Sequence, residues 1–143
     1  MESTGSLTRF LEAQQKDYAT ALEEIRKGKK RSHWMWYIFP QLKGLGFSSM
    51  AVHYGINDIR EAKTFIDDLV VGYRLVHISQ ELLKLQHNYA TAIFGSPDDL
   101  KLPSSMTLFS EVEGTDQVFE KVLVKYYDGV KDTRTLALLS NDL

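Results

Sequence analysis

The chain has 143 residues, a length that suits one domain with a single hydrophobic core. Its formal net charge of −2 argues against a protein whose main task is to coat nucleic acid, because such domains usually carry a broad basic excess. The absence of cysteine excludes disulfides, thiolate metal sites and a cysteine nucleophile. The first residues are polar and no apolar run approaches the roughly 18 residues of a membrane helix, so a cytoplasmic protein with no membrane partner is expected.

The first predicted element is a long amphipathic helix over residues 7–27, where apolar residues recur at helical spacing. Ser6 is the expected N-cap, and Gly28 is the expected left-handed residue at the C-terminal end. Residues 33–39 follow as an aromatic run that is continuous rather than alternating. This run predicts a short buried strand or an extended segment that crosses the core, and Pro40 ends it.

Residues 44–49 are predicted to form a loop that is rich in glycine and serine. Ser48 or Ser49 can cap a short helix after this loop, and Gly55 closes that helix. Asn57 is the expected N-cap of the next amphipathic helix.

A second long helix is predicted to carry the apolar residues from Leu75 to Tyr89 and to end near the Phe-Gly-Ser-Pro sequence at residues 94–97, which is a strong stop signal. Residues 98–103 are expected to form a turn or loop. Ser104 or Ser105 would then start a short helix, because either serine can cap the apolar residues that follow.

A further helix is predicted over residues 118–126, with Gly129 ending it, and Asp132 is the expected cap of the last helix. No repeat, linker or low-complexity tract divides the chain. Helix signals dominate, so the sequence predicts a mainly α, compact multi-helix fold with residues 1–143 in one domain. The segment 34–39 could add one or two short strands.

Two turns have the composition of an anion-binding cradle. Each combines a lysine with a turn residue and paired serines, so that backbone N–H groups and a capped helix N-terminus could face an anion. The residues are Lys43, Gly44, Gly46, Ser48 and Ser49 in the first turn and Lys101, Ser104 and Ser105 in the second. The spacing matches neither the P-loop nor the dinucleotide fingerprint, and an ordinary tight turn with a capped helix is the simpler alternative for each.

The aromatic run carries the candidates for stacking and for acid–base chemistry. Trp34 and Trp36 could stack a base or another planar ring, and they would share one side of an extended segment; the alternative is that they belong to the core. His33 is the candidate acid or base and Asp132 the candidate carboxylate, although a partly exposed histidine and a helix cap are the simpler alternatives. The other histidines lack the spacing of metal ligands, so no metal site is predicted.

Five basic residues crowd the turn before the aromatic run: Arg26, Lys27, Lys29, Lys30 and Arg31. They could steer an anionic ligand toward the aromatic segment. The alternative is a solvated turn after a helix C-terminus, where basic residues are favoured in any case. Of these residues, Arg31 is counted among the candidate ligand contacts.

Segments spread over nearly the whole chain resemble an uncharacterised bacterial family, domain of unknown function eighteen-ten. The most specific segment is GKKRSHWMWYIFPQ at residues 28–41, and others lie at residues 9–14, 50–56, 98–102 and 104–109. The resemblance implies a mostly helical fold and no established activity. The label calpastatin, which the family sometimes carries, finds no support in calpain-inhibitor repeats or in a disordered composition.

The chain departs from the family pattern in two places. Asp68 and Leu69 stand where relatives usually have a His-Pro pair before Gly72, and Pro103 stands where relatives usually have an arginine before the paired serines. If that arginine binds an anion in relatives, the resemblance implies that this chain binds the anion more weakly or not at all.

The candidate ligand contacts, together with His33 and Asp132 as catalytic residues, form one predicted site. The contacts are Arg31, Trp34, Trp36, Gln41, Lys43, Gly44, Gly46, Ser48, Ser49, Tyr54, Lys101, Ser104 and Ser105. No cofactor and no metal is predicted.

Two functions remain open. The first is binding or processing of a phosphate-bearing, nucleotide-like small molecule, with N-glycosidic bond chemistry suggested only by a loose likeness to N-glycosidases that act on ADP-ribose-like and riboflavin-pathway substrates. The second is a noncatalytic interaction module that binds an acidic protein or nucleic-acid surface through the basic patch. A ligand binder should gather Trp34 or Trp36, His33 and Lys101 around one cavity, whereas an interaction module should bury the tryptophans.

Overall fold

The computed structural model describes the backbone of residues 2–141 and the side chains of residues 7–141. Within these residues the chain forms nine helices and no strand, apart from an isolated parallel bridge between Leu42 and Ile56. The helices are α1 (Glu2–Arg26), α2 (Met35–Ile38), α3 (Ser49–Tyr54), α4 (Ile59–Asp67), α5 (Val71–Lys84), α6 (Ala90–Phe94), α7 (Asp98–Ser110), α8 (Val118–Tyr127) and α9 (Thr133–Asn141). The prediction of a mainly α fold is confirmed.

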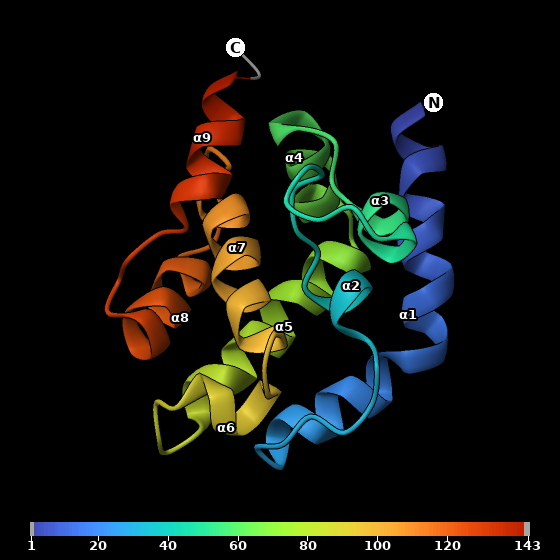
Figure 1. Ribbon diagram of the computed structural model, residues 1–143. Helices are drawn as coiled ribbons and strands as arrows, with labels where there is room; N and C mark the ends of the chain where they lie inside the picture. The colour runs from blue at the N-terminus through green and yellow to red at the C-terminus, as the bar shows by residue number, and fades with distance from the viewer. Residues whose placement is uncertain (1, 142–143) are drawn as a thin grey trace.

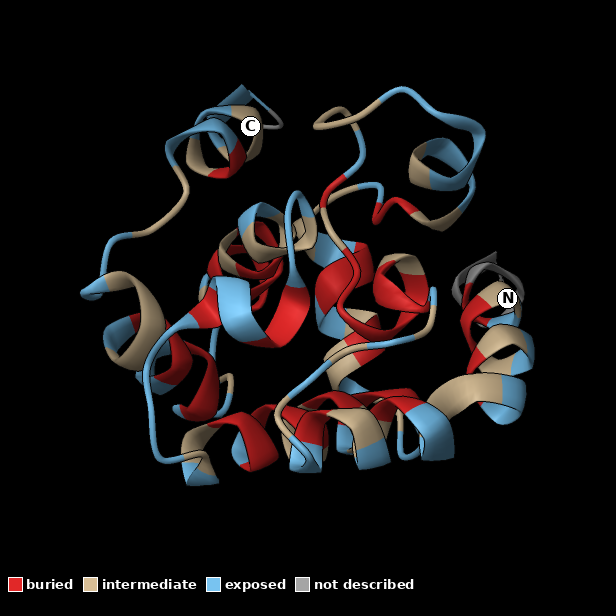
Figure 2. Ribbon diagram, turned by 60° about the horizontal axis from the view of Figure 1, so that its bottom comes forward, coloured by how far each residue is buried: buried red, intermediate tan, exposed pale blue. Residues whose placement is uncertain are grey.

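The helices pack around one continuous hydrophobic cluster. Helix α5 crosses the middle of the molecule and contacts both α1 and α8, and α7 packs on α8 (Figure 1). Figure 2 shows that buried residues line the inward faces of the helices while exposed residues line the outer faces. In the described part of the chain, no helix combines the length and the apolar character that a membrane crossing requires.

Helix α1 begins four residues before the predicted cap, so Ser6 lies inside the helix and is not its N-cap. Its C-terminal end agrees with the prediction, since Gly28 has a positive φ of 77° just beyond Arg26. Buried Phe10, Ala21 and Ile25 repeat at helical spacing on the inward face.

The aromatic run forms a helix, and the prediction of a strand or extended segment at residues 33–39 is wrong. The backbone N–H groups of Ile38 and Phe39 donate to the carbonyls of Trp34 and Met35, each at 3.1 Å. Both hydrogen bonds are helical, and Pro40 then ends the element as predicted. A short run of apolar residues does not distinguish a buried strand from a buried helix, because it has no periodicity to measure.

Side-chain caps define the two helices that follow. Ser48 caps α3 as predicted, because its hydroxyl accepts a hydrogen bond from the backbone N–H of Ala51 at 3.1 Å. The prediction that Asn57 caps the next helix is wrong by one residue: Asp58 is the cap of α4, and its carboxylate accepts from the N–H of Glu61 at 2.9 Å.

The predicted helix over residues 75–89 is two elements, since α5 ends at Lys84 and α6 begins at Ala90. At the other end, α5 begins after Asp68, whose carboxylate accepts hydrogen bonds from the N–H groups of Val70 and Val71 at 2.9 Å. Asp68 therefore supplies an N-terminal capping contact for α5.

The prediction of a loop at residues 98–103 is wrong, because this segment is the first half of α7. Pro103 lies inside the helix and has no N–H to donate to the carbonyl of Asp99. The hydroxyl of Tyr127, from α8, donates to that carbonyl instead, at 2.5 Å. Ser104 and Ser105 consequently lie within the helix and do not start it. The second predicted cradle, which needs these serines at a helix N-terminus, is therefore not formed.

The final two helices end and begin as predicted. Asp128 adopts the left-handed conformation just before Gly129 and terminates α8. Asp132 precedes α9 and accepts a hydrogen bond from the N–H of Thr135 at 3.0 Å, so it caps this helix.

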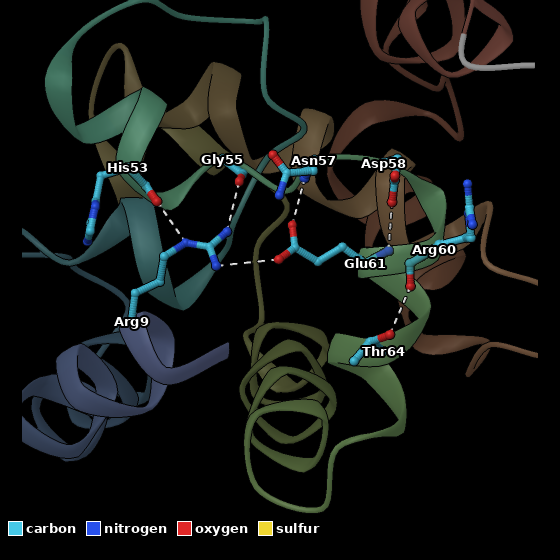
Figure 3. A network of polar contacts seen from close by, with 8 residues as sticks. All are labelled: Arg9, His53, Gly55, Asn57, Asp58, Arg60, Glu61 and Thr64. Atoms are coloured by element: carbon cyan, nitrogen blue, oxygen red, sulfur yellow. Dashed lines mark hydrogen bonds and ion pairs between the residues drawn. The ribbon is translucent and has the colours of Figure 1, made fainter. Parts of the chain in front are cut away.

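Arg9 ties the first helix to the loops around α3 and α4 (Figure 3). Its guanidinium donates to the carbonyls of His53 at 2.7 Å and Gly55 at 2.9 Å, and lies 3.4 Å from the carboxylate of Glu61. Glu61 also accepts from the backbone N–H of Asn57 at 2.7 Å. This network holds the segment that ends at Ile56. The bridge partner of Ile56 is Leu42, which follows Gln41 in the wall of the main cavity described next.

Candidate functional site

A cavity of about 380 Å³ lies between the loop after α2, the N-terminal half of α7 and the start of α9. We call it the Trp36 cavity. Its walls combine one aromatic ring, several apolar side chains, two cations, one carboxylate and two uncharged polar groups. The lining residues are Trp36, Gln41, Leu45, Gly46, Pro97, Leu100, Lys101, Pro103, Ser104, Asp132 and Arg134. The volume and the mixture of apolar walls with a few converging polar groups are typical of a small-molecule site.

Lys101 presents a positive charge at the wall through contacts with two neighbours. Its ammonium lies 3.7 Å from the centroid of the Trp36 ring and 3.1 Å from the carboxylate of Asp98. The same carboxylate pairs with Lys30 at 2.9 Å, and the Lys30 ammonium lies 5.0 Å from the Trp34 ring. Burial raises the pKa of Asp98, but hydrogen bonds from Lys30 and Lys101 outweigh it and hold that pKa below its usual value. Two lysines share one carboxylate, so a net positive charge remains beside the cavity.

Asp132 brings a carboxylate to the cavity with one oxygen fully engaged. Its Oδ2 accepts hydrogen bonds from the Thr135 N–H at 3.0 Å, from the Thr135 hydroxyl and from the Ser104 hydroxyl at 3.2 Å. The backbone N–H of Asp132 donates to the hydroxyl of Thr107 at 2.8 Å. No described residue donates to Oδ1, so the carboxylate is rigidly oriented and still has an oxygen to accept a hydrogen bond from a ligand.

Arg134 is the second cation of the cavity and is not among the residues predicted from the sequence. One guanidinium nitrogen donates to the carbonyl of Leu45 at 3.1 Å, which fastens α9 to the loop after α2. Gln41 faces the same space, and its side-chain amide has no hydrogen-bond partner among the described residues. A basic residue two positions after the predicted cap at Asp132 was the available signal for Arg134, but the contact spans 89 residues of sequence.

The structure gathers part of the predicted site around this cavity. Six predicted residues line it: Trp36, Gln41, Gly46, Lys101, Ser104 and Asp132. Tyr54 lines an adjoining recess of about 10 Å³, which shares part of the wall and has room for about one water molecule. The remaining eight line neither space: Arg31, His33, Trp34, Lys43, Gly44, Ser48, Ser49 and Ser105.

Trp34 is a core residue with 1% of its surface exposed, so the expectation that it shares one side with Trp36 as a stacking surface is not met. Its indole N–H donates to Glu24 at 2.8 Å, and the same carboxylate accepts from the N–H groups of Arg31 and Ser32 and from the Ser32 hydroxyl. Burial raises the pKa of Glu24, but these hydrogen bonds prevail and lower that pKa to about 2. Glu24 therefore organises the basic turn and does not belong to a solvated helix face.

Other predicted contact residues have structural roles away from the cavity. Ser105 is fully buried in α7. The hydroxyl of Ser48 caps α3, a helix of only six residues. His33 is exposed, and its carbonyl accepts a hydrogen bond from the Tyr37 hydroxyl at 3.2 Å. In the part of the chain that the structure describes, no group of three or more His, Asp or Glu side chains could hold a metal ion.

Three of the five basic side chains of the turn make ion pairs within the chain. Arg26 lies 3.2 Å from Glu81, Lys27 lies 3.2 Å from Glu23, and Lys30 is buried against Asp98. Only Lys29 and Arg31 extend to solvent without an ion-pair partner among the described residues, so the patch is smaller than the sequence suggests.

The comparisons with known proteins agree with this fold. A solved structure, the crystal structure of the conserved hypothetical protein Rv1873 from Mycobacterium tuberculosis, is 47% identical, with a TM-score of 0.91 over 94% of this chain and 96% of that chain. No curated protein matches the chain. The family model described as protein of unknown function (DUF1810) matches residues 4–139. The chain therefore belongs to the DUF1810 family.

Proposed function

We propose that the protein binds a phosphate-bearing, nucleotide-like small molecule in the Trp36 cavity. The single observation that carries this proposal is the meeting of Lys101, Arg134 and Asp132 in one cavity of about 380 Å³. Two cations suit an anionic group such as a phosphate, because a charged acceptor forms strong hydrogen bonds with lysine and arginine.

The remaining polar groups suit the sugar of such a ligand. Asp132 Oδ1 can accept a hydrogen bond from a hydroxyl, and the Gln41 amide can both donate and accept. Asp132 also places a carboxylate beside the bound molecule, which is the group that hydrolysis of an N-glycosidic bond needs as a base. The test below therefore measures hydrolysis of each bound compound as well as its binding.

The alternative function, an interaction module that uses the basic patch, has less support. Three of the five basic side chains are held in ion pairs within the chain. The burial of Trp34 and the position of His33 outside the cavity fit that alternative. Trp36 and Lys101 do line one cavity, which meets two of the three conditions expected of a ligand binder.

The first test is a thermal-shift screen against nucleotides, ADP-ribose, sugar phosphates and inorganic phosphate, read by tryptophan fluorescence. A ligand that binds the folded state stabilises it by about 2.7 kcal/mol when its concentration is 100 times Kd. Each hit is then incubated with the protein and analysed for hydrolysis products. We expect a dose-dependent rise in Tm for a phosphate-bearing compound.

A pair of variants tests the location. Arg134→Gln should weaken binding by about tenfold or more, because a hydrogen bond to a charged group is lost from the cavity. Arg60→Gln is the matched control, since Arg60 is an exposed arginine on α4 that lies outside the cavity. The proposal would be refuted if no compound raised the Tm of the folded protein, or if the two variants bound the ligand with equal affinity. Either result would favour the interaction module.

A further inference from the structure

A second cavity of about 500 Å³ adjoins the first and has a different chemical character. We call it the Tyr127 cavity. It lies between the end of α8 and the start of α9, and Tyr126, Tyr127 and Val130 contribute to its lining. Pro103 and Asp132 line both cavities, so the two spaces meet at these residues.

The two tyrosines contribute their ring surfaces to the Tyr127 cavity, because their hydroxyls already donate hydrogen bonds to backbone carbonyls elsewhere. The hydroxyl of Tyr126 donates to the carbonyl of Leu82 at 2.6 Å, and that of Tyr127 donates to the carbonyl of Asp99 at 2.5 Å. Burial raises the pKa of Tyr126 to about 12, so this hydroxyl remains a donor at neutral pH. What is left for a ligand is aromatic and apolar surface.

The charges of the Tyr127 cavity do not suit an anion. Its only basic lining residue is Lys131, whose ammonium lies 2.6 Å from the carboxylate of Glu111 and 3.8 Å from that of Glu120. Asp128 and Asp132 add carboxylates that can accept hydrogen bonds. The Trp36 cavity has the opposite character, because Lys101 and Arg134 line it.

The Trp36 ring is also a poor platform for a ligand ring. The Lys101 ammonium lies 3.7 Å from its centroid and covers one face. The Tyr127 cavity, on the other side of Asp132, offers two further rings, those of Tyr126 and Tyr127.

We infer that the ligand is a nucleoside phosphate that spans both cavities, with its phosphate at Lys101 and Arg134, its ribose at Asp132 and its base in the Tyr127 cavity. This inference rests on the proposed function and adds the base and its location. Bases stack on aromatic side chains, and the exocyclic amine of a base such as adenine can donate to a carboxylate. Asp132 Oδ1, where the two cavities meet, accepts a hydrogen bond from a ribose hydroxyl.

The test compares AMP with ribose 5-phosphate, which carries the same phosphate and sugar but no base, by isothermal titration calorimetry. We expect AMP to bind at least about tenfold more tightly, in line with the stacking energy of one base. Val130→Asp places a charge in the Tyr127 cavity and should reduce the ratio of the two affinities to about one. Val124→Asp is the matched control, because both valines are 64% exposed and only Val130 lines the cavity.

The outcomes separate the two proposals. Equal affinities of the wild-type protein for AMP and ribose 5-phosphate, or a ratio that Val130→Asp leaves unchanged, would overturn the inference and leave the anion site in the Trp36 cavity intact. Binding of neither compound would overturn the inference together with the proposed function. A ratio that falls in Val130→Asp and not in Val124→Asp supports the spanning ligand.

Discussion

At the scale of single residues, Glu24 makes contacts that its position in the sequence does not reveal. It stands next to Glu23 on α1, and its carboxylate accepts hydrogen bonds from the backbone N–H groups of Arg31 and Ser32 and from the indole of Trp34. Glu23 makes a surface ion pair with Lys27, with both side chains mostly exposed. Two adjacent and identical residues therefore differ because one of them faces a chain segment that returns across the helix.

Glu24→Gln should destabilise the protein by about 1–2 kcal/mol at pH 7, because the hydrogen bonds lose their charge assistance. The folded-state pKa of Glu24 is lowered from 4.5 to about 2, so the carboxylate contributes stability that is fully present above pH 4.5 and is lost as the pH falls toward 2. Urea unfolding of wild type and variant between pH 7 and pH 3 should show the difference narrowing below pH 4.5. Glu23→Gln is the control and should change stability by less than about 0.5 kcal/mol at every pH. If the stability difference between wild type and Glu24→Gln stayed constant with pH, the lowered pKa of Glu24 would be contradicted.

At the scale of secondary-structure elements, α7 persists through Pro103 because a neighbouring helix replaces the missing donor. The Tyr127 hydroxyl occupies the carbonyl of Asp99 that an ordinary residue 103 would reach with its N–H. The proline also lines both cavities, so this hydrogen bond helps to hold a residue at which the two spaces meet.

Tyr127→Phe should cost about 1–3 kcal/mol in the wild-type background, because it leaves a helix carbonyl without its donor. In a Pro103→Ala background the cost should be smaller, since the new N–H can reach the same carbonyl. A double-mutant cycle measured by urea unfolding gives the coupling. Tyr126→Phe is the control: its hydroxyl serves Leu82, and its cost should be the same in both backgrounds. Equal costs of Tyr127→Phe in both backgrounds would show that the hydroxyl does not replace the lost N–H.

At the scale of the whole molecule, Arg9 connects the first helix to segments more than 40 residues away. Its side chain is 15% exposed and that of Glu61 is 7% exposed, so the pair is shielded from water. Through His53 and Gly55 the same guanidinium holds the loop that leads back to the Leu42–Ile56 bridge, next to Gln41 and the cavity wall.

Arg9→Met should lower the free energy of unfolding by about 3 kcal/mol, because it leaves the Glu61 carboxylate buried without its cation. Arg60→Met, on the exposed side of α4, should stay within about 0.5 kcal/mol of wild type. Chemical denaturation of both variants provides the comparison. If Arg9→Met and Arg60→Met were equally mild, the network of Figure 3 would be a surface feature and not a link between distant parts of the chain.

The sequence by itself determined the features that depend on neighbours along the chain. Helical spacing predicted α1 and α8, and local capping predicted the roles of Ser48 and Asp132, because a cap acts on an N–H only three residues away. The family resemblance rested on the segment around Trp34 and was confirmed.

Tertiary structure alone decided the features that depend on distant partners. The aromatic run is helical although its sequence has no readable period. Residues 98–103 form the first half of α7, and Tyr127, 28 residues from Asp99, donates to the carbonyl that Pro103 leaves without a helical donor. The candidate site also required folding, since Arg134 meets Leu45 across 89 residues while neighbouring Trp34 and Trp36 are separated into core and cavity wall. The physical reason is the same in each case: burial and hydrogen bonding depend on which side chains the fold brings together, and local spacing does not contain that information.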